Sequence, residues 1–89
     1  MDVEELIEEI NEIINNEGYS LVLYNDDINT FEHVIACLVT YVSHTQVQAE
    51  QCAMIAHHKG KCSIKNDNLN KLLALKDVLT KNKLIVKIE

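Results

Sequence analysis

The spacing of apolar residues along the chain predicts three strands and three helices between positions 19 and 89. Residues 19–24 are rich in Tyr, Leu and Val, while 61–65 and 84–89 alternate apolar side chains with others, and these patterns are typical of strands. Helical periodicity fills the intervals, with helices expected at about 31–42, 44–58 and 69–81. The order βααβαβ predicts a small α+β domain, in which a three-stranded antiparallel sheet packs against three helices.

Capping residues indicate where these helices begin and end. Asn29 is expected to cap the first helix, with Glu32 reaching back to it as in a capping box. Ser43 to Gln46 forms a second capping box, which opens the next helix directly, so the two helices should meet at a sharp corner. Gly60 is expected to end that second helix in a left-handed conformation, and Asn66 to Asn68 to cap the third.

The predicted helix 44–58 is apolar on two sides. One side carries larger side chains, those of Val47, Met54 and Ile55. The other side carries small ones, those of Ala49, Cys52, Ala53 and Ala56. A helix that is apolar most of the way round is expected to be largely buried. Its small side should let another element approach closely, or leave a hollow.

Charge divides the chain into an N-terminal segment and a core domain, 1–17 and 18–89. Residues 1–17 carry seven acids and no base, with apolar residues at helical spacing, so they form either an amphipathic helix or an acidic arm. All eight lysines lie in 59–89, and the chain has no arginine and few aromatic residues. Nucleic-acid binding is therefore not expected, because arginine would be needed for bidentate phosphate contacts and aromatic residues for base stacking.

The expected location is the cytoplasm. No apolar run is long enough to span a membrane, and the acidic N-terminus does not resemble a secretory or mitochondrial signal. Three widely spaced cysteines argue against a disulfide framework and favour a reducing compartment.

Catalytic and metal chemistry is poorly supported by the residue spacing. Cys52 and His57 are five residues apart on one predicted helix, so their side chains point to different sides. His57 and His58 also diverge, and His33 and His44 have no partner at a metal-ligand spacing. No glycine-rich phosphate loop is present. We therefore expect no catalytic residue, no metal and no cofactor.

A cluster of hydrogen-bond acceptors lies at the first strand-to-helix junction, in Asn25–Asp27. If the short corner makes the first two helices antiparallel, His57 comes close to this cluster, above a floor of Ala53 and Ala56. Amide oxygen, carboxylate and imidazole can together accept the three donors of an ammonium group. The residues alone leave two readings open: a site for a protein N-terminus with a large first residue, or a solvated turn beside a structural histidine.

Three segments resemble the ClpS adaptors of the bacterial Clp protease. These are LVLYNDDINTFEHVI, with the NDD motif after a strand, AEQCAMIAHHKGKC, with a helix ending in His-x-x-Gly, and the closing strand KNKLIVKIE. The resemblance covers about 19–89, with a shorter connection around 65–70 than is usual for the family. It implies the same βααβαβ fold, which is also similar to that of a ribosomal-stalk domain.

The resemblance also implies a function without catalysis. A ClpS adaptor binds the free N-terminus of proteins that begin with Leu, Phe, Tyr or Trp and delivers them to the N-terminal domain of a ClpA- or ClpC-like AAA+ unfoldase. It implies that Asn25, Asp26 and His57 hold the α-amino group, and that Asp67 and Lys71 contact the unfoldase. The implied side-chain pocket consists of Asp27, Asn29, Phe31, Val34, Ala53, Ala56 and Leu84. We expect a monomer.

Two departures from the family pattern affect the implied pocket. Asn29-Thr30-Phe31 stands where the family commonly has Thr-Pro-Met, so a stiffer Phe31 replaces the methionine that gates the pocket. Ala53 and Ala56 stand where bulkier residues often occur. Our hypothesis is that a larger gate and a deeper floor compensate. The alternative function is a protein-docking or assembly module without any N-terminus pocket.

Overall fold

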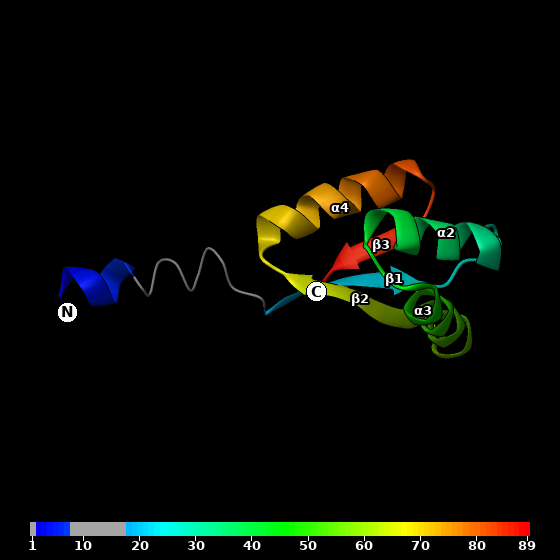
Figure 1. The fold of residues 1–89 in the computed structure, drawn as a ribbon, viewed down its shortest axis with the longest axis horizontal. Coiled ribbons are helices and arrows are strands. Elements are labelled where there is room, and N and C mark those ends of the chain that lie inside the picture. The colour runs from blue at the N-terminus through cyan, green and yellow to red at the C-terminus, as the bar shows by residue number, and fades with distance from the viewer. Residues whose placement is uncertain (1, 8–17) are drawn as a thin grey trace.

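The computed structural model describes residues 2–7 and 18–89 (Figure 1). Its six elements in chain order are β1 (Tyr19–Tyr24), α2 (Phe31–Tyr41), α3 (Gln46–Lys59), β2 (Lys61–Asp67), α4 (Leu69–Lys81) and β3 (Ile85–Ile88). The predicted βααβαβ order and the α+β class are therefore confirmed.

The sheet has β1 at its centre, with β2 and β3 pairing antiparallel on either side. Leu21 and Leu23 of β1 lie opposite Ile88 and Val86 of β3, so the inward-facing apolar positions of the two strands coincide. A β-bulge between Leu21 and Val22 shifts the pairing with β2. Strand β2 is at an edge of the sheet, a position that its alternating lysines suit.

One core joins the inward side of the sheet to the helices. Its fully buried side chains come from all layers: Leu21, Leu38, Leu72 and Leu79. Helix α4 packs across all three strands, whereas α3 packs against α2 and the edge strand β2. Helix α3 is thus at the margin of the helical layer (Figure 1).

Two of the three expected helix N-caps were wrong by one or two residues, whereas Asn68 caps α4 as predicted. Thr30, not Asn29, caps α2, and its hydroxyl accepts a hydrogen bond of 3.1 Å from the His33 N–H. Asn29 instead donates hydrogen bonds to the Asp26 carboxylate and belongs to the turn before the helix, so the helix begins one residue later than expected. Helix α3 is capped by Thr45, which forms a capping box with Gln48 rather than one starting at Ser43.

The expectation that helix α3 is largely buried was also wrong. Only its small side is buried, and the larger apolar side chains Val47, Met54 and Ile55 are 61%, 50% and 42% exposed. The marginal position of α3 explains this, because no element covers its outer side among the described residues. Gly60 ends the helix with φ at +93°, as predicted.

The beginning of the acidic N-terminal segment is helical. Residues 3–7 form a helical turn, and the Asp2 carboxylate accepts a hydrogen bond of 2.8 Å from the Glu5 N–H at its start. Residues 2–7 are all exposed, and they lie apart from the domain in Figure 1. The rest of the predicted 1–17 helix or arm lies outside the described residues. No helix in the described part of the chain is long and apolar enough to cross a membrane.

Candidate functional site

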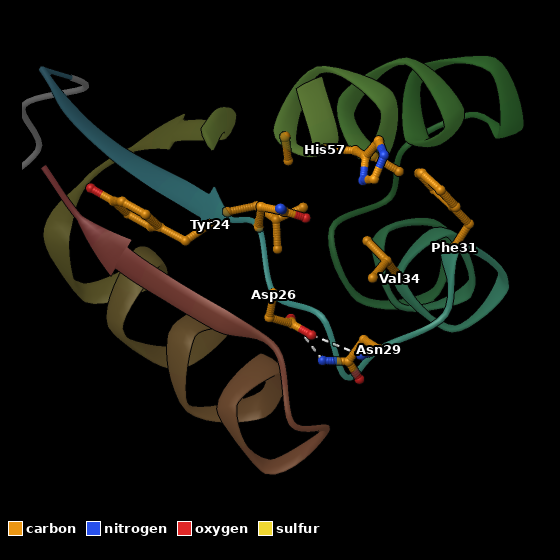
Figure 2. Close-up of a pocket in the computed structure, with 10 residues that line it drawn as sticks. Tyr24, Asp26, Asn29, Phe31, Val34 and His57 are labelled. Carbon is orange, nitrogen blue, oxygen red and sulfur yellow. Dashed lines mark hydrogen bonds between the residues drawn. The ribbon is translucent and has the colours of Figure 1, made fainter. Parts of the chain in front are cut away.

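A cavity lies where the end of β1, the start of α2 and the end of α3 meet (Figure 2). Its volume is about 50 Å³, and it is open to solvent. The residues that line it are Leu23, Tyr24, Asn25, Asp26, Asn29, Phe31, Val34, Ala53, Ala56 and His57. The structure therefore brings the end of α3 to the start of α2, as expected, although the two helices cross steeply instead of packing antiparallel (Figure 2).

The loop between β1 and α2 is fixed by a small hydrogen-bond network. Asp26 Oδ1 accepts from the N–H groups of Ile28 and Asn29, at 2.8 and 2.7 Å, and its Oδ2 accepts from Asn29 Nδ2 at 2.9 Å (Figure 2). Asn29 Nδ2 also donates to the Lys83 carbonyl oxygen at 2.8 Å. The Asn25 N–H donates to the Gly60 carbonyl oxygen at 2.9 Å. The loop is thus attached both to the end of α3 and to the approach to β3.

The same hydrogen bonds favour the ionised form of the Asp26 carboxyl group. Burial by itself would raise the pKa of this carboxyl group, but the hydrogen bonds from the Asn29 backbone and side chain and from the Ile28 N–H favour the ionised form. The net effect is a pKa below the ordinary aspartate value. A carboxylate has about four acceptor positions, and these bonds use three of them. Asp26 therefore keeps its negative charge, and one acceptor position of its carboxylate is not used by these bonds.

The opposite wall of the cavity is aromatic and apolar. The rings of Phe31 and His57 meet edge to face, with centroids 5.2 Å apart, on the other side of the cavity from Asp26 (Figure 2). Ala53 and Ala56 are nearly completely buried and line the cavity from α3. The volume of about 50 Å³ is well below the ~150 Å³ of an engineered cavity that binds benzene. With Phe31 in this position, the small floor does not leave an aromatic-sized hollow.

Eight of the ten residues expected around the α-amino group and the side-chain pocket line this cavity, and Asp27 and Leu84 do not. Asp27 is exposed, whereas the side chain of its neighbour Asp26 is bonded within the loop to Asn29. Leu84 is only 3% exposed and belongs to the hydrophobic core. Sequence reasoning missed Leu23 and Tyr24 as lining residues, although both directly precede the Asn25–Asp27 cluster at the end of β1.

The two residues expected at an unfoldase contact lie elsewhere. Asp67 ends β2 and Lys71 is in the first turn of α4, with 4.0 Å between Lys71 Nζ and Asp67 Oδ1. Since β2 begins beside Gly60, at the cavity, and ends at Asp67, this pair is a strand length away from the cavity. A ligand in the cavity would leave the pair accessible.

Two of the other three histidines have structural bonds, and the third, His58, is exposed with its ring 5.1 Å from that of His57. His33 Nε2 is 2.8 Å from the Asn82 carbonyl oxygen, and His44 Nε2 is 2.7 Å from that of Ile64. Across residues 2–7 and 18–89, no group of three or more His, Cys, Asp or Glu side chains is placed to hold a metal ion.

Comparisons with known proteins place the chain in the ClpS family. Residues 15–84 match the family model of the ATP-dependent Clp protease adaptor protein ClpS. The chain is 36% identical over 48 residues to a Clp protease adapter protein ClpS of Thermosynechococcus vestitus, covering 53% of this chain and 51% of that protein. It thus spans about half the length of that relative. It is also 36% identical over 63 residues to the E3 ubiquitin-protein ligase ubr-1 of Caenorhabditis elegans, covering 68% of this chain but 3% of the ligase.

Among solved structures, ClpS2 of Agrobacterium tumefaciens, bound to L-phenylalaninamide, has a similar fold. The TM-score is 0.70 at 19% sequence identity, and the match covers 80% of this chain and 93% of that one.

Proposed function

The chain belongs to the ClpS family of adaptors of the ATP-dependent Clp protease, and we propose that it binds the free N-terminus of proteins that begin with a bulky apolar residue. In this proposal the bound protein is delivered to the N-terminal domain of a ClpA- or ClpC-like unfoldase, in the cytoplasm. The family is one of adaptors rather than catalysts, so the function consists of two binding events and no chemical step.

The observation that supports this proposal is the pairing of a charged acceptor with an apolar wall across one cavity. An N-terminal residue carries an ammonium group and a side chain on the same carbon atom, so its binding site needs both features within a few ångströms. Asp26 supplies the charge, and Asn25 and His57 line the same cavity with further polar groups. Phe31, Val34 and the two alanines of α3 supply the apolar part.

The ligand bound to the structurally similar ClpS2 also supports the proposal. The Agrobacterium ClpS2 is bound to L-phenylalaninamide, a molecule with a free α-amino group and a benzyl side chain but no carboxylate. A fold shared with this chain can therefore hold such a group.

Binding of a fluorescent peptide that begins with Leu, measured with a free and with an acetylated N-terminus, tests the proposal. Acetylation removes the positive charge, so affinity should fall by more than tenfold. Asp26→Asn should cause a similar loss, because leaving a charge unpaired in such a contact costs about 2–5 kcal/mol. Asp27→Asn is the matched control, since it makes the same charge change at an exposed residue that does not line the cavity. Equal binding of both peptides would instead favour a docking module without an N-terminus pocket.

Delivery is tested separately. Lys71→Glu should weaken complex formation with an isolated unfoldase N-terminal domain while leaving peptide affinity unchanged, because Lys71 lies away from the cavity. Lys81→Glu is the control, since Lys81 forms a comparable i,i+4 ion pair at the other end of α4, where its Nζ is 2.9 Å from Asp77 Oδ2. Equal effects of both substitutions would argue against a specific contact at Asp67 and Lys71.

A further inference from the structure

Two of the three cysteines lie on elements that pack against each other. Cys52 lies on the side of α3 that carries the buried residues Ala49, Ala53 and Ala56. Cys62 is the second residue of β2 and pairs with Leu23 of β1, whose side chain faces the core. Helix α3 packs against β2 (Figure 1), and both cysteines are half-buried against the same core cluster. The fold therefore turns both side chains into the contact between α3 and β2.

The two thiols are close enough to influence each other. Burial is the main cause that raises the pKa of Cys52 to about 12, and the neighbouring Cys62 thiol contributes as well. The Cys62 thiol donates to the Ser63 carbonyl oxygen at 3.5 Å. Both cysteines are free thiols. The third, Cys37, is only 4% exposed on α2, where its Sγ is 3.7 Å from His33 Nε2. Only the first two form a facing pair.

We propose that Cys52 and Cys62 are a redox-active dithiol, which small disulfides such as oxidised glutathione convert to an intramolecular disulfide. The Cys62 thiolate attacks one sulfur of the oxidant and releases one glutathione thiolate. The Cys52 sulfur then attacks the Cys62 sulfur and releases the second. Two cysteine thiols are oxidised, one glutathione disulfide is reduced, and the two protons go to the glutathione thiolates.

The order of these two steps follows from the surroundings of the thiols. A thiol with a raised pKa has little thiolate at neutral pH, so Cys52 is the slower one to attack a free oxidant. Once Cys62 is in a mixed disulfide, its contribution to the raised pKa of Cys52 is removed, while the larger contribution from burial remains. The attack of Cys52 is then intramolecular, so it needs no second molecule of oxidant.

The disulfide would act on the candidate site, an extension that rests on the proposed function. Ala53, Ala56 and His57 lie within the segment that a Cys52–Cys62 bond closes, as does Gly60, whose carbonyl holds the Asn25 loop. A disulfide requires a sulfur–sulfur distance of about 2.05 Å, well inside a non-bonded contact. Closing the bond draws α3 toward β2 and moves His57 relative to Asp26. We expect at least a twofold loss of peptide affinity.

Mass spectrometry of the full chain after incubation with oxidised glutathione tests the dithiol without any peptide. The wild type and Cys37→Ser should each lose two hydrogen atoms and yield a cross-linked peptide pair containing Cys52 and Cys62. Cys52→Ser should instead stop at a glutathione adduct on Cys62. A wild type that gives only glutathione adducts, intermolecular disulfides or a bond to Cys37 would overturn the proposal, and this result does not depend on how any variant folds.

Peptide binding to reduced and oxidised Cys37→Ser then tests the extension. A Kd that rises at least twofold on oxidation and recovers on reduction supports it, and an unchanged Kd refutes it. If neither form discriminates the free from the acetylated peptide, the proposed function fails, while the mass result for the dithiol still stands.

Discussion

Replacing Phe31 by methionine should shift the preference for first residues toward aromatic side chains. The cavity volume of about 50 Å³ is roughly a third of the ~150 Å³ that holds benzene in an engineered cavity. A leucine side chain therefore needs a smaller adjustment than a benzyl or indole group, which requires Phe31 to move. Phe31 can move outward, since its side chain is 40% exposed and lies at the start of α2.

The size of the shift follows from the contact that is lost. Moving Phe31 breaks its edge-to-face contact with His57, and such a contact contributes about 0.5–1.5 kcal/mol. Aromatic ligands lose this energy in the wild type and leucine does not. Methionine is flexible and can yield at low cost. With about 1 kcal/mol at stake, the ratio of the Kd for a Phe-initiated peptide to that for a Leu-initiated one should fall about fivefold in the variant.

Fluorescence anisotropy with peptides that differ only in a first residue of Leu, Phe or Trp measures this ratio. Ile28→Met is the matched control, because Ile28 is 89% exposed and does not line the cavity. A Phe-to-Leu ratio that stays the same in the Phe31 variant would show that Phe31 does not gate the cavity. Equal affinities for all three peptides in the wild type would lead to the same conclusion.

The remaining predictions concern pH, two helix ends and the loop. The stability from Asp26 is fully present above its unfolded pKa of about 3.9 and should be lost as the pH falls through its lowered folded pKa; unfolding of Asp26→Asn should lack this acidic limb. Peptide affinity should also fall at high pH, as the ligand's α-amino group (pKa about 7.7–8.0) loses its proton. Gly60→Ala should lower the free energy of unfolding in urea by about 1–2 kcal/mol, because φ is +93° although a Cβ would meet no atom within 4 Å. Thr30→Ala should cost about 1 kcal/mol of stability through loss of the N-cap, whereas Asn29→Ala should weaken peptide binding as well, because Asn29 holds Asp26.

The order of elements was predictable from sequence because each element satisfies a local rule. Strands β1 and β3 are rich in β-branched and aromatic residues, and α2 and α4 have one apolar face each. The helix starts were less predictable, since two local patterns compete around Asn29. Asn29 and Glu32 fit a capping box, but Asp26 is also placed to accept from Asn29, and the structure has the second arrangement. Burial of α3 could not be predicted at all, because it depends on which elements lie beside it.

The candidate site was predictable to the extent that it depends on topology. Asn25, Asp26 and His57 line one cavity because the short corner between α2 and α3 lets the end of α3 come to the start of α2, although the two helices cross rather than run antiparallel (Figure 1). Asp27 and Leu84 were inferred from family resemblance, and the geometry places both outside the cavity. The cavity volume was also beyond sequence reasoning, because it depends on the position that Phe31 takes against His57.

The arrangement of acceptors has a consequence for which amines the proposed site can bind. Asp26 has one acceptor position left after its bonds within the loop, so it can take one of the three donors of an ammonium group. The other two donors then need Asn25 and His57, which line the cavity with it. A lysine side chain has the same ammonium head, but its straight four-carbon stem places no branch beside the charge. It would leave the space between Phe31 and Ala56 unfilled. Discrimination of α-amines from lysine therefore depends on the apolar half of the cavity, not on the charged half, and a cavity enlarged at Phe31 should lose part of it.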